Sequence, residues 1–286
     1  MTSVRLTAID EAALAEVGQF LHHNVNRRIS PEAWAGSLVY PWCDSRPNFG
    51  FQLRDGDKLV GVFCAIYSAQ TIEGRIERFC NPHSWCVLSD YRKHSLGLAL
   101  ALIKQPSYHF TMLTPNPKVA EIFIRLGFKL MNERVVVIPN LPSPIAAIEA
   151  HIAECDTDRI ARHLSGHVLR DFEAHRTIPW LAFLAFGKGD DICLIVYKIG
   201  CWKRLPCANI MHVSDPAAFD RHLHLMQHCL LLRHGLLVSR AEARFLCRVP
   251  HIAYSERRTQ SKLFQSSTVK DSQIGDLYSE LAALDL

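Results

Sequence analysis

The sequence lacks several patterns that would place it at once in a well-defined class of protein. It contains ten cysteines, yet none form a CxxC pair and their spacing is not that of a small disulfide-bonded domain. No segment reaches the roughly 18 consecutive apolar residues of a membrane-spanning helix. The N-terminal residues also lack the basic stretch and apolar core of a secretory signal. These absences favour a cytoplasmic protein with reduced cysteines and no membrane partner.

The chain also lacks a strong excess of either positive or negative charge. The chain has 32 Lys and Arg against 28 Asp and Glu, a net charge of +4, and no dense basic block. A nucleic-acid partner is therefore not expected, although a local anion site is compatible with this balance. With 286 residues, 49% of them apolar, the chain can bury a sizeable core, and two medium domains are favoured over one.

Three common site motifs are missing. There is no GxGxxG, no GxxxxGK[ST] and no GxSxG, so the sequence does not indicate a dinucleotide-binding Rossmann domain, a P-loop or a serine-hydrolase elbow. His222, His224 and His228 have helical spacing, but the HExxH glutamate is absent. We interpret these histidines as one face of a helix, and no metal site is expected.

What is present is an alternation of helical and strand patterns, which predicts an α/β fold with a mixed (α+β) sheet. Asp10 and Ser30 are predicted N-caps of two early helices, and Asp55-Gly56 joins two apolar runs as a hairpin turn. The segments that follow are predicted as a strand at 84–88, a helix to about 104, a strand at 108–113, a helix at 117–126 and a strand at 134–138.

A basic turn separates the strand at 84–88 from the helix after it. It reads SDYRKHSLGLALALI from Ser89. A helix start leaves backbone N–H groups unpaired, and phosphate oxygens are suitable partners for them. Arg92, Lys93 and His94 add positive charge there. Taken alone, the segment is more typical of an ordinary helix start with a solvated basic loop.

This turn resembles the CoA loop of the GNAT superfamily of acyl-CoA-dependent N-acyltransferases, which has the form Arg/Gln-x-x-Gly-x-Gly/Ala. Here the loop reads Arg92-Lys93-His94-Ser95-Leu96-Gly97, with Ser95 in place of one glycine. The strand YHFTML, Asn116 and the segment VAEIFIRLGF follow in the family's order. The resemblance covers about residues 50 to 138.

The resemblance implies that acetyl-CoA or another acyl-CoA is the co-substrate. Backbone N–H groups of the strand would face the thioester carbonyl, and the loop would hold the pyrophosphate. The implied CoA-binding residues are Trp85, Cys86, Val87, Leu88, Arg92, Lys93, His94, Ser95, Leu96, Gly97, Leu98, Asn116 and Phe123. Phe123 stands where the family often has a tyrosine that protonates the departing thiolate, a role that phenylalanine cannot perform.

The catalytic base is expected between the hairpin and the loop. Of the candidates there, Glu77 is the first choice and His83 the second, each against the alternative of a solvent-exposed side chain. Cys86 lies in an apolar strand, so a buried and unreactive thiol is favoured over an acyl-carrying nucleophile.

The second half of the chain repeats the order of the first. The hairpin around Gly56 has a counterpart around Gly189. In both halves an apolar strand ends in Ser-Asp, at Asp90 and at Asp215, and a helix follows. We therefore predict two GNAT-like domains in tandem: residues 1–140, a linker at 141–150, and a degenerate second domain at 151–286 with an acceptor-side or structural role. The second loop, SDPAAFDRH, lacks the CoA pattern, so one CoA per chain is expected. Apolar residues at helical spacing predict a docked helix near the C-terminus, at Ile274, Leu277, Tyr278, Leu281 and Leu284.

The expected reaction is transfer of an acyl group, acetyl in the first instance, from acyl-CoA to an amine. The acceptor is a small-molecule or peptide amine that the sequence does not identify. Two alternatives stay open: a non-catalytic acyl-CoA-binding or regulatory protein, and a structural interaction module that binds no CoA.

Overall fold

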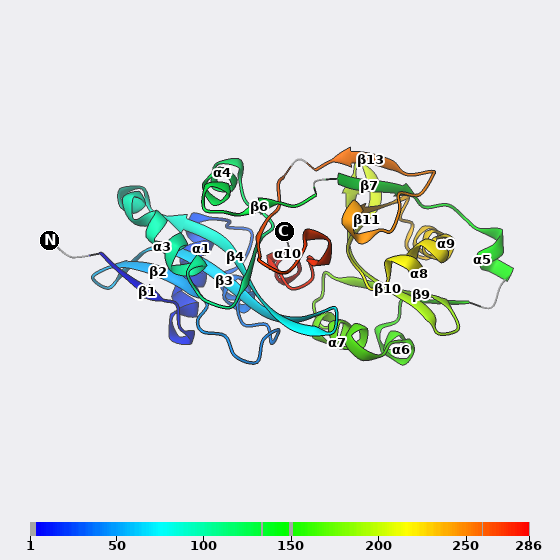
Figure 1. Cartoon of the computed structure of the whole chain (residues 1–286), viewed down its shortest axis with the longest axis horizontal. Coiled ribbons are helices and arrows are strands. Elements are labelled where there is room, and N and C mark those ends of the chain that lie inside the picture. Colours follow the sequence, from blue (N-terminus) through cyan, green and yellow to red (C-terminus); the bar gives the residue numbers. More distant parts are fainter. Residues whose placement is uncertain (1–3, 133, 149–150, 259, 286) are drawn as a thin grey trace. The chain divides into compact units, whose positions relative to one another are not determined.

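The computed structural model describes residues 4–132, 134–148, 151–258 and 260–285, which fall into two compact units (Figure 1). The first unit comprises Met1–Met131, Gln260–Gln273 and Tyr278–Leu286, and the second comprises Asn132–Thr259 and Ile274–Leu277. Each unit is built around one seven-stranded sheet. Within the described residues, no helix has both the length and the apolar character needed to cross a membrane.

The sheet of the first unit has the strand order β1-β2-β3-β4-β5-β14-β6. Its β2–β3 hairpin turns at Gly56, whose φ of +61° lies in the left-handed region that glycine adopts without strain. All neighbours are antiparallel except β4 and β5. The strands are β1 Val4–Ala8, β2 Gly50–Asp55, β3 Lys58–Ile72, β4 Arg75–Val87, β5 His109–Met112, β6 Lys129–Leu130 and β14 Leu263–Gln265.

Helices of the first unit begin where the sequence places their caps. Asp10 accepts a hydrogen bond from the Ala13 N–H, and Ser30 accepts one from the Ala33 N–H. An apolar core of the unit includes Phe63, Leu98 and Phe123, which lie on β3, α3 and α4. The helices are η1 Glu11–Ala13, α1 Leu14–Asn24, α2 Pro31–Gly36, η2 Ser89–His94, α3 Ser95–Ile103, α4 Pro117–Arg125, η5 Asp271–Gln273 and α10 Glu280–Ala283.

The sheet of the second unit repeats this plan. Read from β8, its order is β8-β9-β10-β11-β12-β7-β13, and again the fourth and fifth strands, β11 and β12, are the parallel pair. The β9–β10 hairpin turns at Gly189, with a φ of +58°. The strands are β7 Arg134–Pro139, β8 Ile152–Glu154, β9 Ala182–Lys188, β10 Asp191–Trp202, β11 Leu205–Val213, β12 Val238–Glu242 and β13 Tyr254–Arg257. The predicted mixed α/β architecture, with two units of the same plan, is thus confirmed.

Helices of the second unit pack on a separate core. Phe186, Phe219 and Met226 are buried together in it, from β9, α8 and α9. The helices are α5 Pro144–Ile148, α6 Thr157–Ile160, η3 Ala161–His163, α7 Gly166–His175, α8 Pro216–Arg221, α9 Leu223–His234 and η4 Ala243–Phe245.

The contacts divide the chain differently from the predicted ranges 1–140, 141–150 and 151–286. Strand β7, predicted to close the first domain, pairs with β12 and β13 in the second sheet. The sixth place in the first sheet is taken instead by β14, from the C-terminal part of the chain. Local patterning specifies a strand but not its partner, which explains the difference. The predicted linker contains α5, and its residues 149–150 lie outside the described part of the chain.

The predicted C-terminal helix is also shorter than expected. Only Glu280–Ala283 is helical, although Ile274, Leu277 and Leu284 are all buried. The apolar pattern therefore reflects burial of an irregular segment rather than a continuous helix.

Candidate active site

Strand β4 separates from β5 in the middle of the first sheet. The two strands pair only at Phe79 with His109 and at Cys80 with Phe110. Beyond this point the register between β3 and β4 shifts near Phe63, and Ser84 has a φ of +55°. An irregularity of this kind bends a strand and re-aims its side chains. It leaves the second half of β4 without a β5 partner among the described residues.

Two cavities lie along this part of β4. One has a volume of about 430 Å³ and the other about 840 Å³. Trp85, Asn116 and Val119 line both of them, so the two cavities meet at β4 and the start of α4. They form one candidate site within the first unit.

The larger cavity is lined by both basic and apolar side chains. Arg92, Lys118 and Arg125 line it, together with Leu96 and Ile122, and no acidic residue does. Of the predicted CoA-binding residues, it brings together Trp85, Cys86, Val87, Arg92, Ser95, Leu96 and Asn116. Lys118 and Arg125 were not predicted, although with Ile122 they recur at i, i+4 and i+7 on one face of a helix, which is a readable signal.

The other predicted CoA-binding residues do not line either cavity. Lys93 is exposed beside the site, and Leu98 is buried in the core. Leu88, His94 and Gly97 are partly buried. Phe123 is fully buried and packs edge-on against Trp85, so its ring serves the core beneath the cavity rather than the cavity wall.

The basic turn is more ordered than a bare loop. Residues Ser89–His94 form a 3₁₀ helix that leads into α3, and the Ser95 N–H donates to the Arg92 carbonyl. Tyr91 anchors the turn by donating its hydroxyl to Asp55 at 2.7 Å. The first turn of α3 lacks a side-chain cap, and the 3₁₀ turn before it accepts the Ser95 N–H.

The matching position in the second unit is built differently. Asp215 caps α8 by accepting from the N–H groups of Ala217 and Ala218, and Pro216 has no N–H to offer. The donors that would meet a phosphate are therefore already occupied or missing.

The smaller cavity gathers buried polar atoms that have no protein partner. His83 Nε2, Trp85 Nε1 and Glu280 Oε2 are each buried without a hydrogen bond, and all three residues line it. An unpaired buried polar group costs about 1–3 kcal/mol, so such groups are rare unless a ligand or water satisfies them. Three in one cavity are what a ligand-binding site would show.

Glu280 was not predicted. Thr114 donates its hydroxyl to Glu280 Oε1 at 2.7 Å, and the Glu280 N–H donates to Asn81 at 3.1 Å. Asn81 also donates to the Thr111 carbonyl on β5 at 2.9 Å, so it fixes both the strands and the carboxylate. Burial raises the pKa of Glu280. A lone carboxylate within the apolar segment LYSELAAL was the available sequence signal.

Only one of the two predicted bases, His83, lies in the candidate site. His83 lines the smaller cavity, where Nδ1 lies 2.9 Å from the Ser84 hydroxyl, and burial lowers its pKa to about 3. Its imidazole is therefore neutral at pH 7. Glu77 lines neither cavity; it pairs with His109 at 2.9 Å and is partly exposed.

Cys86 has the environment of an unreactive thiol. Burial raises its pKa, although the nearby Arg92 opposes this. A raised pKa disfavours the thiolate that a nucleophile needs.

The three spaced histidines do not meet at one point. His222 lies 2.7 Å from Asp191, and His228 accepts from the Ser143 N–H at 3.1 Å.

Comparison with known proteins gives a consistent picture of the fold. No protein-family model and no curated protein matches the sequence. Solved structures do match. A GCN5-related N-acetyltransferase from Anabaena variabilis superposes with a TM-score of 0.58 at 12% identity, over 92% of this chain and 72% of that one. One from Kribbella flavida gives 0.55 at 14% identity, over 92% and 72%.

A conserved protein of Enterococcus faecalis gives a TM-score of 0.62 at 9% identity, over 95% of this chain and 74% of its own. These matches extend over both units, and at such low identity they speak for the fold. The chain therefore has the fold of the GCN5-related N-acetyltransferases, the GNAT superfamily.

Proposed function

We propose that the first unit transfers an acyl group from acyl-CoA to an amine. The observation that carries the proposal is the meeting of two unlike cavities at the opening between β4 and β5. One is cationic and apolar, and the other holds a buried carboxylate with one oxygen, Glu280 Oε2, that accepts no hydrogen bond from the described residues. A phosphate-bearing thioester suits the first cavity, and an amine suits the second.

The donor side follows from charge. Arg92, Lys118 and Arg125 supply positive charge for the phosphates of CoA, and Leu96 and Ile122 supply apolar contact for its linker arm. Backbone N–H groups near Trp85, where β4 has no described β5 partner, are candidates for stabilising the oxyanion. Acetyl-CoA is the first donor to test.

The acceptor amine must lose a proton to become a nucleophile. Glu280 is the proposed base, because burial raises its pKa and so its basicity, whereas burial makes His83 a weaker base. The neutral amine attacks the thioester carbonyl, a C–N bond forms and the C–S bond breaks. Glu280 takes the proton of the ammonium group before attack. After attack the nitrogen releases its second proton to solvent, and the expelled thiolate takes one from solvent, since Phe123 offers none.

The cavity also restricts the acceptor. Trp34, Phe63 and Met112 give it apolar walls around the one carboxylate of Glu280. We propose an amine with an apolar body, either a small molecule or the end of a peptide, whose ammonium group first pairs with Glu280.

Calorimetric titration with acetyl-CoA tests the donor assignment. Arg92→Glu should weaken binding by at least about 1 kcal/mol, the scale of a charge-assisted hydrogen bond. Lys104→Glu is the matched control, because Lys104 lies at the other end of the same helix and lines neither cavity. Unchanged affinity in Arg92→Glu, or equal loss in both variants, would rule out this site.

One observation favours a second function, acyl-CoA binding without transfer. Phe123 is fully buried and cannot supply the proton that the family's tyrosine gives to the thiolate. Thiol release measured over a panel of amines separates the two functions. Release above the rate of hydrolysis supports transfer, and tight CoA binding with no release supports the binding protein.

A further inference from the structure

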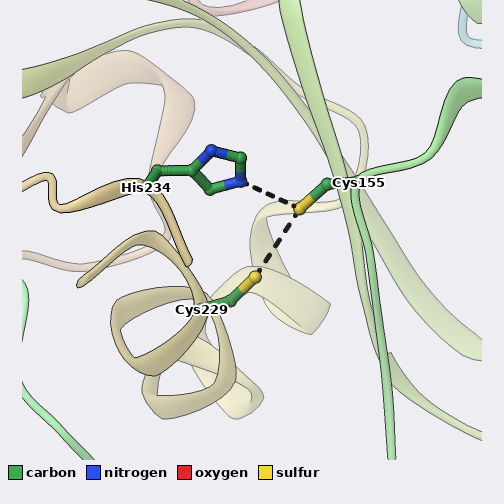
Figure 2. A group of neighbouring side chains, drawn as sticks. All are labelled: Cys155, Cys229 and His234. Atoms are coloured by element: carbon green, nitrogen blue, oxygen red, sulfur yellow. Dashed lines mark hydrogen bonds between the residues drawn. The ribbon is translucent and has the colours of Figure 1, made fainter. Parts of the chain in front are cut away.

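Two cysteines and a histidine converge in the second unit, away from the candidate active site. Cys155 follows strand β8, while Cys229 and His234 lie on helix α9 (Figure 2). Cys155 Sγ is 3.6 Å from Cys229 Sγ and 3.3 Å from His234 Nε2. All three ligand atoms lie within 4.8 Å of one another.

Local sequence explains why His234 reaches this place. Gly235 has a φ of +65° and ends α9, so His234 is the last residue of the helix. On the strand side, Glu154 accepts from the N–H groups of Cys155 and Asp156, which holds the turn after β8. Both sides of the cluster are therefore fixed by backbone contacts.

Two of the three distances between ligand atoms are close to those of a tetrahedral metal site, and the third, from Cys229 Sγ to the His234 ring, is within 4.8 Å. With Zn–S at about 2.3 Å and Zn–N at about 2.05 Å, ideal angles give an S–S edge of about 3.8 Å and an S–N edge of about 3.6 Å. The observed edges, 3.6 and 3.3 Å, are slightly shorter and need only a small expansion. Thiolate and imidazole together are a ligand set that favours zinc among divalent metals.

We propose that Cys155, Cys229 and His234 bind one zinc ion, with water as the fourth ligand. Cys229 is buried, Cys155 is partly buried and His234 is exposed, so the open position faces solvent on the histidine side. A disulfide alone would account for the two thiols but not for the imidazole nitrogen directed at Cys155 (Figure 2). The ion would link the turn after edge strand β8 to α9.

Zinc itself is the probe. Full-length protein, reduced and stripped with a chelator, should take up one equivalent of zinc in competition with a chromophoric chelator, and cobalt should give thiolate charge-transfer absorption. Zinc should also raise the melting temperature. His234→Ala, an exposed change that spares the fold, and Cys155→Ser should each lower zinc affinity at least ten-fold. Cys201→Ser, at an exposed thiol of the same unit, should not.

Three results would overturn the proposal. The first is no stoichiometric uptake by the reduced protein. The second is uptake that is unchanged in His234→Ala and Cys155→Ser, which would place the ion elsewhere. The third is formation of a Cys155–Cys229 disulfide in air by a protein that takes up no zinc when reduced, which would identify a redox pair.

Discussion

At the scale of single residues, the candidate site depends on side chains whose burial changes their chemistry. Glu280 and His83 line one cavity and both are buried, yet burial moves their pKa values in opposite directions. The carboxyl becomes a better base and the imidazole a poorer one. Glu77, partly exposed and paired with His109, is the natural comparison.

Glu280→Gln should lower kcat by about 10² or more, because general-base catalysis contributes on that scale. Activity of the parent should rise with pH through the raised pKa of Glu280, and the variant should lose this rise.

The same raised pKa means that Glu280 contributes stability below its unfolded-state pKa and loses it as pH rises through the folded value. The variant should therefore be more stable than the parent at neutral pH.

The measurements are a pH–rate profile and urea unfolding at low and neutral pH. Glu77→Gln serves as the control and should keep both the rate and its pH dependence. If Glu77→Gln alone abolished the rise with pH, the base would be Glu77 instead.

Phe123→Tyr should not restore the family's proton donor. The ring is fully buried against Phe63, Trp85 and Phe128, so the added hydroxyl would have no described polar partner. We expect a loss of about 1–3 kcal/mol in unfolding free energy and no gain in rate. Denaturant unfolding and steady-state kinetics test this, and a faster enzyme would show that the ring reaches the thiolate.

At the scale of elements, the two units differ most where a helix follows the fourth strand. In the first unit, α3 begins after a 3₁₀ turn without a side-chain cap; in the second, Asp215 and Pro216 close the start of α8. The same strand–helix junction therefore has no side-chain cap in the first unit, where we propose the phosphate site, and a capped helix in the second.

Asp215→Ala combined with Arg221→Ala should leave acetyl-CoA affinity unchanged, with one equivalent bound per chain. Loss of the Asp215 cap should still cost about 1 kcal/mol of stability, and loss of the exposed Arg221–Asp191 pair little more. Titration gives both affinity and stoichiometry. Two equivalents per chain, or weakened binding in this variant, would contradict the assignment of CoA to the first unit alone.

At the scale of the whole molecule, each unit is built from separate segments of the chain: the first unit contains both N-terminal and C-terminal segments. The C-terminal part of the chain returns to the first sheet as β14, between β5 and β6, and brings Glu280 to the cavity. Leu263 and Phe264 of this strand are buried. The first unit thus depends on residues from both ends of the sequence.

Ending the chain at Arg258 should destabilise the first unit and abolish transfer, because an interior strand and the proposed base are both removed. Circular dichroism, limited proteolysis and CoA titration test this. Leu263→Ala, which keeps Glu280, should cost about 2–5 kcal/mol and separates loss of the strand from loss of the base. A stable and active fragment ending near Leu141 would contradict this account.

Local signals in the sequence were sufficient for the caps at Asp10 and Ser30, the hairpin turns at Gly56 and Gly189, and the repeated strand–helix order. Each depends on hydrogen bonds or backbone angles within a few residues, so a short stretch of sequence is enough to predict it. The residues from Trp85 to Leu96 that line the larger cavity lie close together in sequence, and for that reason they could be predicted.

Only the tertiary structure decided which strands pair and which distant side chains meet. Strands β7 and β14 have ordinary strand patterns, and their places in opposite sheets follow from packing that no local pattern specifies. Glu280 and His83 line one cavity, and Cys155 lies beside Cys229 and His234, although long stretches of chain separate them. Such contacts depend on the whole fold. The free energy that brings these side chains together comes from burial of many apolar residues elsewhere, and not from the few residues that come to lie together.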